Sequence, residues 1–266
     1  MVFPLGDDDS DIRTLPIVNY VLIALNVFVF VVFQGMGQND DFTYKYSTVP
    51  AEIASGEDKV TDGRIVQDPI TGQQFRVPGL GVTPVSVYLT LLTSMFMHGS
   101  IMHLLGNMWF LWIFGNNIED DLGHARYVAF YLLTGIIASL CHVVLNLAGD
   151  NAMVPSLGAS GAISGVMGAY LILHSQRPVR VFLFRVMTIV PGWVAVGLWF
   201  VFQLISSMGM LGGGSGGGGV AYAAHIGGFI AGALLAKPFT IGRPPKAALT
   251  IGYPNPRRQW PRELEP

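Results

Sequence analysis

Six stretches of mostly apolar residues, each close to the length of a membrane-crossing helix, constrain this chain more than any other feature. A helix needs about 20 predominantly apolar residues to cross the hydrocarbon core of a bilayer. Only 12% of the 266 residues are charged, against about 25% in soluble domains, and the mean hydropathy is +0.49. The stretches are 17–34, 100–115, 126–148, 159–175, 186–208 and 220–236. The sequence therefore predicts an all-α, polytopic membrane protein built as a bundle of six transmembrane helices spanning 17–236.

The ends of two of these stretches need separate comment. The second is short, and we expect the apolar segment 85–96 before it to form an interfacial helix that leads into it. The first follows Asp7, Asp8, Asp9 and Asp11, where a secretory signal peptide would carry positive charge. We therefore expect the first stretch to be a retained span.

The basic residues predict the orientation of the bundle, because cytoplasmic loops carry an excess of Lys and Arg. With the N-terminus inside, eleven of the 15 basic residues fall on the cytoplasmic side and four on the other. The eleven are Arg13, Arg126, Arg177, Arg180, Arg185, Lys237, Arg243, Lys246, Arg257, Arg258 and Arg262; the four are Lys45, Lys59, Arg64 and Arg76. Both terminal segments, 1–16 and 237–266, are therefore predicted to be cytoplasmic. A plasma membrane of prokaryotic type is the expected location.

The connections differ in composition. The long extracytoplasmic loop, about 35–86, mixes charges with apolar residues, so we expect it to be partly ordered against the membrane face. The run 212–219 reads GGGSGGGG and has the composition of a flexible coil; it is either a bare connector or a mobile flap beside the last helix. The tail 237–266 is rich in Pro and Arg, and we predict that it is disordered.

The charge balance excludes some classes of partner. With 15 Lys and Arg against 17 Asp and Glu, the net charge is −2, so the chain has no basic field that would attract nucleic acid. Cys141 is the single cysteine, which rules out an internal disulfide. We expect membrane lipid as a partner, and no nucleic acid, metal or cofactor.

Polar side chains inside the spans are functional candidates, because they are costly in lipid. They are His98, His103, Asn107, Ser160 and His225. Each has a structural alternative: a serine in a membrane helix often bonds back to the carbonyl one turn earlier, and histidines and asparagines often tie helices together.

Two predicted helices have faces rich in small residues, and one of these faces carries a serine and the other a histidine. At about 100° per residue, one face of the fourth span carries Ser160, Gly161, Ser164, Gly165 and Gly168. A matching stripe on the last span carries Ala221, His225, Gly228 and Gly232. Helices with such faces pack to backbone contact, which would bring Ser160 within hydrogen-bonding reach of His225. A serine beside a neutral imidazole is an activatable nucleophile.

The second span offers hydrogen-bond donors for acyl transfer. His103 and Asn107 are four residues apart and share one helix face. Together with the backbone N–H of Ser160, their side chains would supply the donors that stabilise a developing oxyanion. The alternative for both is a purely structural role between helices.

These motifs resemble those of the rhomboid family of intramembrane serine proteases. The matching residues are GxSG at 158–161, the AH..G pattern at 224–228, HxxxN at 103–107, His98 five residues before it, and the stretch 115–120 after it. The resemblance covers roughly 16–236. It implies a six-helix rhomboid-like bundle with a water-filled cavity and a serine–histidine dyad.

Roles follow from the resemblance residue by residue. It implies that Ser160 is the nucleophile, that His225 is the general base, and that His103 and Asn107 line the oxyanion site, with His98 near the cavity. It implies single-span membrane proteins as substrates, cut in or beside the span, and the fifth span as a gate. No acidic third member is visible, and an aromatic residue such as Tyr170 is our hypothesis for what orients His225.

Two other functions remain open. A non-catalytic rhomboid-like protein that binds membrane clients would keep the fold, although such relatives lack the serine or histidine that this chain retains. A channel or transporter would use intramembrane histidines as pathway residues, but the chain shows no inverted repeat and no charged residue deep in a span.

Overall fold

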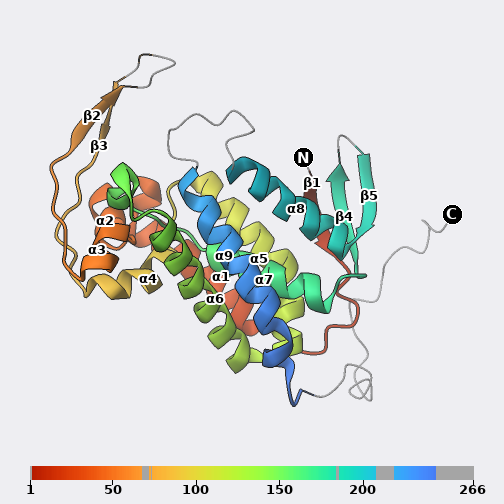
Figure 1. Cartoon of the computed structure of the whole chain (residues 1–266). Coiled ribbons are helices and arrows are strands. Elements are labelled where there is room, and N and C mark those ends of the chain that lie inside the picture. Colours follow the sequence, from red (N-terminus) through yellow and green to blue (C-terminus); the bar gives the residue numbers. More distant parts are fainter. Residues whose placement is uncertain (1, 68–71, 73, 184–185, 208–218, 244–266) are drawn as a thin grey trace.

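A bundle of helices forms the body of the protein (Figure 1). The computed structural model describes residues 2–67, 72, 74–183, 186–207 and 219–243. The main helices are α1 (Ile17–Phe28), α5 (Ile101–Leu122), α6 (His124–Leu145), α7 (Ser160–Leu173), α8 (Gly192–Ser207) and α9 (Gly219–Thr240). Each overlaps one predicted span, and the mostly helical character of the chain is confirmed. The run 212–218 and the tail beyond 243 lie outside the described residues.

Shorter elements complete the chain. A π-helical segment (Val29–Phe33) continues α1, and single-turn 3₁₀ helices occupy Gly35–Gly37, Val87–Leu89, Ser94–Phe96 and Gly149–Met153. The remaining elements are α2 (Asp40–Lys45), α3 (Pro50–Ser55), α4 (Thr90–Thr93), and the strands β1 (Val2–Asp7), β2 (Arg64–Gln67), β3 (Gln74–Val77), β4 (Pro178–Leu183) and β5 (Val186–Pro191).

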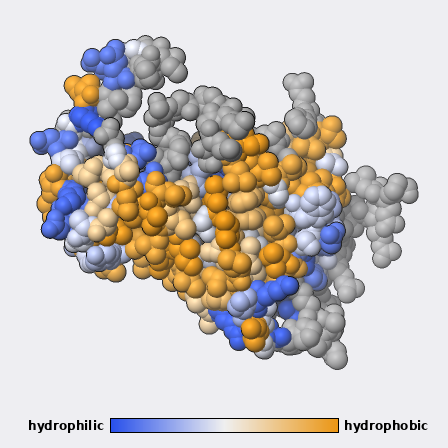
Figure 2. Space-filling view, in the orientation of Figure 1, coloured by the Kyte–Doolittle hydropathy of each residue, from blue (hydrophilic) through white to orange (hydrophobic). Residues whose placement is uncertain are grey.

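The number of membrane spans is not confirmed by helix length. Among the described residues, α6 alone is both long and apolar enough to cross a bilayer as a single straight helix. The segment Val87–Phe96 and α5 pass together, but they are bent by 79° at the break between them. The helices Ile17–Phe33, Ser160–Leu173 and Gly192–Ile205 are apolar but shorter. A broad apolar surface nevertheless covers the helices, with hydrophilic residues gathered toward the two ends (Figure 2).

Helices α7 and α9 touch through their backbones. A Cβ atom on Gly232 would overlap the carbonyl oxygen of Gly165, and one on Gly228 would overlap the carbonyl oxygen of Gly161. A Cβ on Gly168 would in turn overlap the carbonyl oxygen of Phe229. The predicted contact between the two small-residue faces is therefore confirmed.

Helix α5 ends seven residues later than predicted, at Leu122 rather than at 115, because its acidic last turn is buried rather than exposed. Glu119 accepts hydrogen bonds from the backbone N–H groups of Val18 (2.9 Å) and Asn19 (2.7 Å) at the start of α1. Asp120 accepts from the N–H groups of Arg13 (3.1 Å) and Thr14 (3.0 Å). The first N–H groups of a helix lack partners within it, so Glu119 anchors the start of α1, and Asp120 holds the segment that leads into it.

A small antiparallel sheet, which the prediction of an all-α fold did not include, lies beside α8 (Figure 1). Its strand order is β1-β4-β5, with Phe3 opposite Phe182 and Val179 opposite Val190. Residues 186–191 therefore form a strand, although we expected them to begin the fifth span. Val179 alternates with exposed neighbours along β4 and is fully buried, which is the two-residue period of a strand.

Asp7, at the end of β1, connects the sheet to the bundle. Its Oδ2 accepts hydrogen bonds from the Asn117 amide of α5 (2.6 Å) and from the Tyr170 hydroxyl of α7 (2.8 Å). Burial raises the pKa of Asp7 to about 7, and the hydrogen bond from Tyr170 offsets only part of that rise. Tyr170 is therefore committed to Asp7, and the hypothesis that it orients His225 is wrong.

Part of the loop 35–86 packs against the bundle, whereas its predicted order against the membrane face stays a prediction. Val49 and Ile53 are buried, and Thr48 forms a β-bridge with Ser156, close to the start of α7. Strands β2 and β3 pair as an antiparallel hairpin that projects from the body (Figure 1).

The close approach of α7 and α9 at glycines predicts that two alanine variants differ strongly in their free energy of unfolding. Gly232→Ala should lower the free energy of unfolding by about 3 kcal/mol, because the new methyl group meets rigid backbone. Gly197→Ala on α8 is the control, since a Cβ there meets nothing within 4 Å and alanine favours helix. Circular dichroism during thermal unfolding in detergent measures both. Equal stability of the two variants would contradict the close approach of α7 and α9.

The raised pKa of Asp7 predicts that the contribution of this residue to the free energy of unfolding depends on pH. Its pKa is raised from 3.8 to about 7 in the folded protein, so its contribution is complete below pH 3.8 and is lost as the pH rises toward about 7. The size is on the order of a few kcal/mol. Asp7→Asn keeps an oxygen acceptor and cannot ionise, so the stability difference between variant and wild type should grow across this range in thermal unfolding. A difference that is constant with pH would contradict the raised pKa.

Candidate active site

Ser160 is the first residue of α7, and the turn before it requires a glycine. Gly158 has a φ of +128°, which side chains rarely adopt. A Cβ atom at Gly158 would also lie 2.9 Å from Cε1 of His103. The turn therefore places Ser160 at the N-terminal end of α7, and the His103 ring packs against Gly158.

His225 on α9 lies opposite Ser160. Its Nε2 is 2.7 Å from Ser160 Oγ, a hydrogen-bonding distance between two residues 65 positions apart in the sequence. The bond to a carbonyl one turn earlier, which was the structural alternative for Ser160, is made by Ser164 instead: its hydroxyl donates to the Ser160 carbonyl oxygen (2.6 Å). The backbone contact between α7 and α9 thus brings a serine and an imidazole together.

Gln203 on α8 is the second partner of the imidazole and was missed in the sequence. Its Oε1 is 3.0 Å from His225 Nδ1, and its side chain is buried. The signal was present, because Gln203 is a polar residue within the apolar run 193–205. The rule that singled out the histidines and Asn107 would also have selected it.

The aromatic neighbours of His225 come from α8 and α9. The ring centroids of Trp199 and Tyr222 lie 6.2 Å and 6.3 Å from that of His225. The imidazole is therefore placed by two hydrogen bonds and enclosed by rings from two helices.

His103 lies against the turn that precedes Ser160, and His98 lies beside His103. The rings of His98 and His103 meet edge to face with centroids 5.1 Å apart. The backbone of His98 is held by Gln34, which accepts from its N–H (2.9 Å) and donates to its carbonyl oxygen (3.0 Å). Asn107 lies one turn along α5 from His103, and its buried Nδ2 has no hydrogen-bond partner among the described residues. Its amide is thus an available donor.

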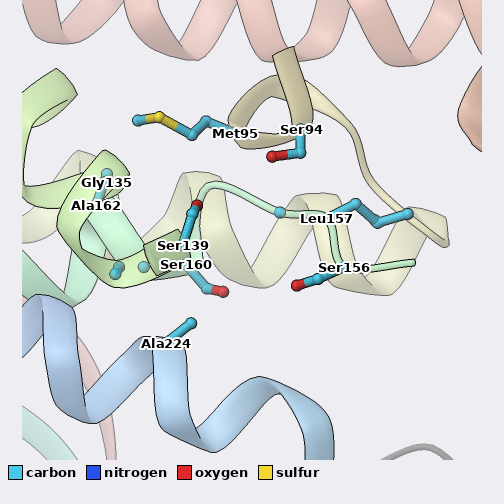
Figure 3. Close-up of a pocket in the computed structure, with 12 residues that line it drawn as sticks. Ser94, Met95, Gly135, Ser139, Ser156, Leu157, Ser160, Ala162 and Ala224 are labelled. Carbon is cyan, nitrogen blue, oxygen red and sulfur yellow. The ribbon is translucent and has the colours of Figure 1, made fainter. Parts of the chain in front are cut away.

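A small cavity opens beside Ser160 (Figure 3). Its lining includes Ser94, Ser139 of α6, Ser156 and Ala224 of α9. It has room for about one water molecule. Several serine hydroxyl groups therefore surround a space the size of a water molecule next to Ser160.

Over the described ranges, no group of three or more His, Cys, Asp or Glu side chains converges as metal ligands would.

Comparison with known proteins identifies relatives of this chain. Residues 86–241 match the Rhomboid domain family. The mouse "Presenilin-associated rhomboid-like protein, mitochondrial" is 31% identical over 53% of this chain and 39% of its own length. "Rhomboid protein 1, mitochondrial" of Saccharomyces cerevisiae is 33% identical over 56% of this chain and 41% of its own length. "Rhomboid protease GluP" of Bacillus subtilis is 34% identical over 56% of this chain and 26% of its own length. The chain therefore spans less than half the length of these relatives.

The relatives contradict the predicted location. The mouse and yeast proteins are named as mitochondrial, so the prediction of a prokaryotic plasma membrane with cytoplasmic termini is wrong. Hydropathy and loop charge indicate that a bilayer is present, but they do not distinguish one organelle or organism from another.

The turn before Ser160 generates a prediction about reactivity. Gly158→Ala should reduce fluorophosphonate labelling of Ser160 at least about 10-fold, because the new Cβ both strains the backbone and displaces His103. Gly106→Ala is the control, since a Cβ there on α5 meets nothing within 4 Å. Mass spectrometry of labelled Ser160 measures both. Equal labelling of the two variants would contradict the positioning role of the turn.

Proposed function

The chain belongs to the rhomboid family, and we propose that it is an intramembrane serine endopeptidase that cuts single-span membrane proteins in or near their transmembrane segment. The observation that carries the proposal is the 2.7 Å contact between Ser160 Oγ and His225 Nε2. The relative from Bacillus subtilis is named a rhomboid protease. Because the mouse and yeast relatives are named as mitochondrial, we propose that the activity is located in a mitochondrial membrane.

In the proposed reaction, Ser160 is the nucleophile and His225 the general base. As Ser160 Oγ attacks the peptide carbonyl carbon, its proton passes to His225 Nε2, and the carbonyl π electrons move to the oxygen. When the intermediate collapses, the C–N bond breaks and His225 returns that proton to the leaving amine. Water, deprotonated by His225, then hydrolyses the acyl-enzyme and restores Ser160.

Oxyanion stabilisation is assigned to three donors. The backbone N–H of Ser160 is at the start of a helix, where such groups have no partner within the helix. Asn107 Nδ2 is buried without a partner among the described residues, and His103 packs against the turn at Gly158. An unpaired buried donor is costly, and an oxyanion would satisfy it. Each such donor typically contributes about 10²-fold or more to the rate.

The substrate must reach the site as an extended strand. In a helix, a carbonyl oxygen accepts a hydrogen bond from within the helix, and its carbon is enclosed by the turn. Cleavage therefore requires local unwinding at small or helix-breaking residues. The exposed apolar surface over the helices (Figure 2) is suited to lipid and to an apolar substrate helix.

The alternative, a non-catalytic protein that binds membrane clients, is less consistent with the site. Binding alone does not require a hydroxyl in hydrogen-bonding contact with an imidazole that has a second polar partner. We therefore retain the protease as the proposed function.

The proposal predicts complete loss of activity in two variants. Ser160→Ala and His225→Ala should each abolish cleavage of a model single-span substrate in liposomes, because each removes one partner of the proton transfer. A fluorophosphonate probe should label Ser160 in the wild type and no other serine. Ser139→Ala is the control, because Ser139 lines the cavity but has no role in the proposed reaction. Normal cleavage by Ser160→Ala would refute the proposal.

A further inference from the structure

We propose that Gln203 is a positioning residue that fixes the tautomer and orientation of His225, so that Ser160, His225 and Gln203 act as a neutral triad. The inference rests on the proposed function and adds a third helix, α8, to the machinery. It stands on two contacts of a single imidazole ring: 2.7 Å from Nε2 to Ser160 Oγ and 3.0 Å from Nδ1 to Gln203 Oε1.

The two contacts select one tautomer. A neutral imidazole carries one N–H and one lone pair. For Ser160 to be deprotonated, Nε2 must present the lone pair, so the N–H must be on Nδ1. The carbonyl oxygen of Gln203 is an acceptor only and lies where that N–H points. With the Gln203 amide oriented as in the structure, the opposite tautomer would place the Gln203 oxygen against a lone pair.

Other candidates for this role are committed elsewhere. Ser164, one turn along α7 from Ser160, donates to the Ser160 carbonyl oxygen. Tyr170, two further turns along, donates to Asp7. The titratable groups that face His225 from other helices are His103 of α5 and His142 of α6. A second cation there would oppose the positive charge that His225 acquires during catalysis, whereas the Gln203 carbonyl dipole stabilises it.

The surroundings explain why an amide is suited to this position. Gln203 is 8% exposed and lies on an otherwise apolar helix face near Trp199 and Phe200, which pack against α9. A buried carboxylate must lose its hydration, which is costly in apolar surroundings. An amide orients the imidazole without that cost, although it stabilises the imidazolium less than a carboxylate would.

The test compares two substitutions at Gln203 with a neighbouring control. Gln203→Leu keeps the size of the side chain and removes the acceptor; it should lower kcat about 10- to 100-fold, the effect of losing one hydrogen bond to a charged group, with KM changed less than about 2-fold. Gln203→Glu keeps an acceptor and adds charge; it should retain more activity than Gln203→Leu and shift the acid limb of the pH–rate profile to higher pH. Phe202→Leu is the control, because Phe202 is exposed on the same helix.

A second readout separates this inference from the proposed function. Histidine ¹⁵N NMR of the full chain in detergent, assigned by comparison with His225→Ala, reports which ring nitrogen of His225 carries the proton. We expect the Nδ1–H form in the wild type and a mixture of tautomers in Gln203→Leu. This measurement requires no substrate, so it tests Gln203 even in a protein that cleaves nothing.

The outcomes are distinct. A wild type that neither cleaves nor reacts with fluorophosphonate would overturn the proposed function. A Gln203→Leu variant with the wild-type kcat, pH profile and tautomer would overturn the role of Gln203 while the protease remained. A loss as large in Phe202→Leu as in Gln203→Leu would reduce Gln203 to a packing residue and would also overturn its role.

Discussion

Helices α7 and α9 lie in backbone contact because glycines face each other along their shared interface, and the site depends on this contact. A methyl group on Gly228 or Gly232 would overlap a carbonyl oxygen of α7. At a wider helix separation, the Ser160 hydroxyl and the His225 ring could not meet at 2.7 Å. Side chains in lipid gain little from hydrophobic burial against each other, so close packing of small residues is an effective way to hold such helices together.

Polar contacts fix the elements around this pair. Glu119 anchors the start of α1 through two backbone N–H groups, and Asp7 joins β1 to α5 and α7. Helix α7 therefore carries Ser160, the proposed nucleophile, at its first residue and is tied to the small sheet through Tyr170 near its last turn. Each of these contacts pairs a buried polar group that would otherwise be costly in an apolar bundle.

The site couples three helices through one imidazole. Ser160 of α7 and Gln203 of α8 bind opposite nitrogens of His225 of α9. The protonation state of the ring is thus linked to the positions of all three helices. The contact from Gln203 also ties the imidazole beside Ser160 to α8, the helix that the family resemblance implies as a gate.

Most residues of the candidate site could be predicted from the sequence, since they stand out in local patterns. Polar residues in apolar stretches indicated Ser160, His225, His103 and Asn107, and glycine spacing indicated which helix faces would meet. Gln203 carries the same signal but was passed over. The alternation along β4 is a weak signal, because a short apolar strand and the first turns of an apolar helix have similar hydropathy.

Apart from the glycine-lined contact of α7 and α9, the contacts between distant segments could not be predicted from local patterns. The sequence by itself determined that the chain is a mostly helical membrane protein of the rhomboid type, with a serine and a histidine on helix faces of small residues. Only the tertiary structure decided that Glu119 binds the start of α1, that Tyr170 binds Asp7, and that Gln203 rather than Tyr170 binds His225. The physical reason is that composition and period are properties of one segment, whereas the partner of a buried polar atom is set by which other segments pack around it.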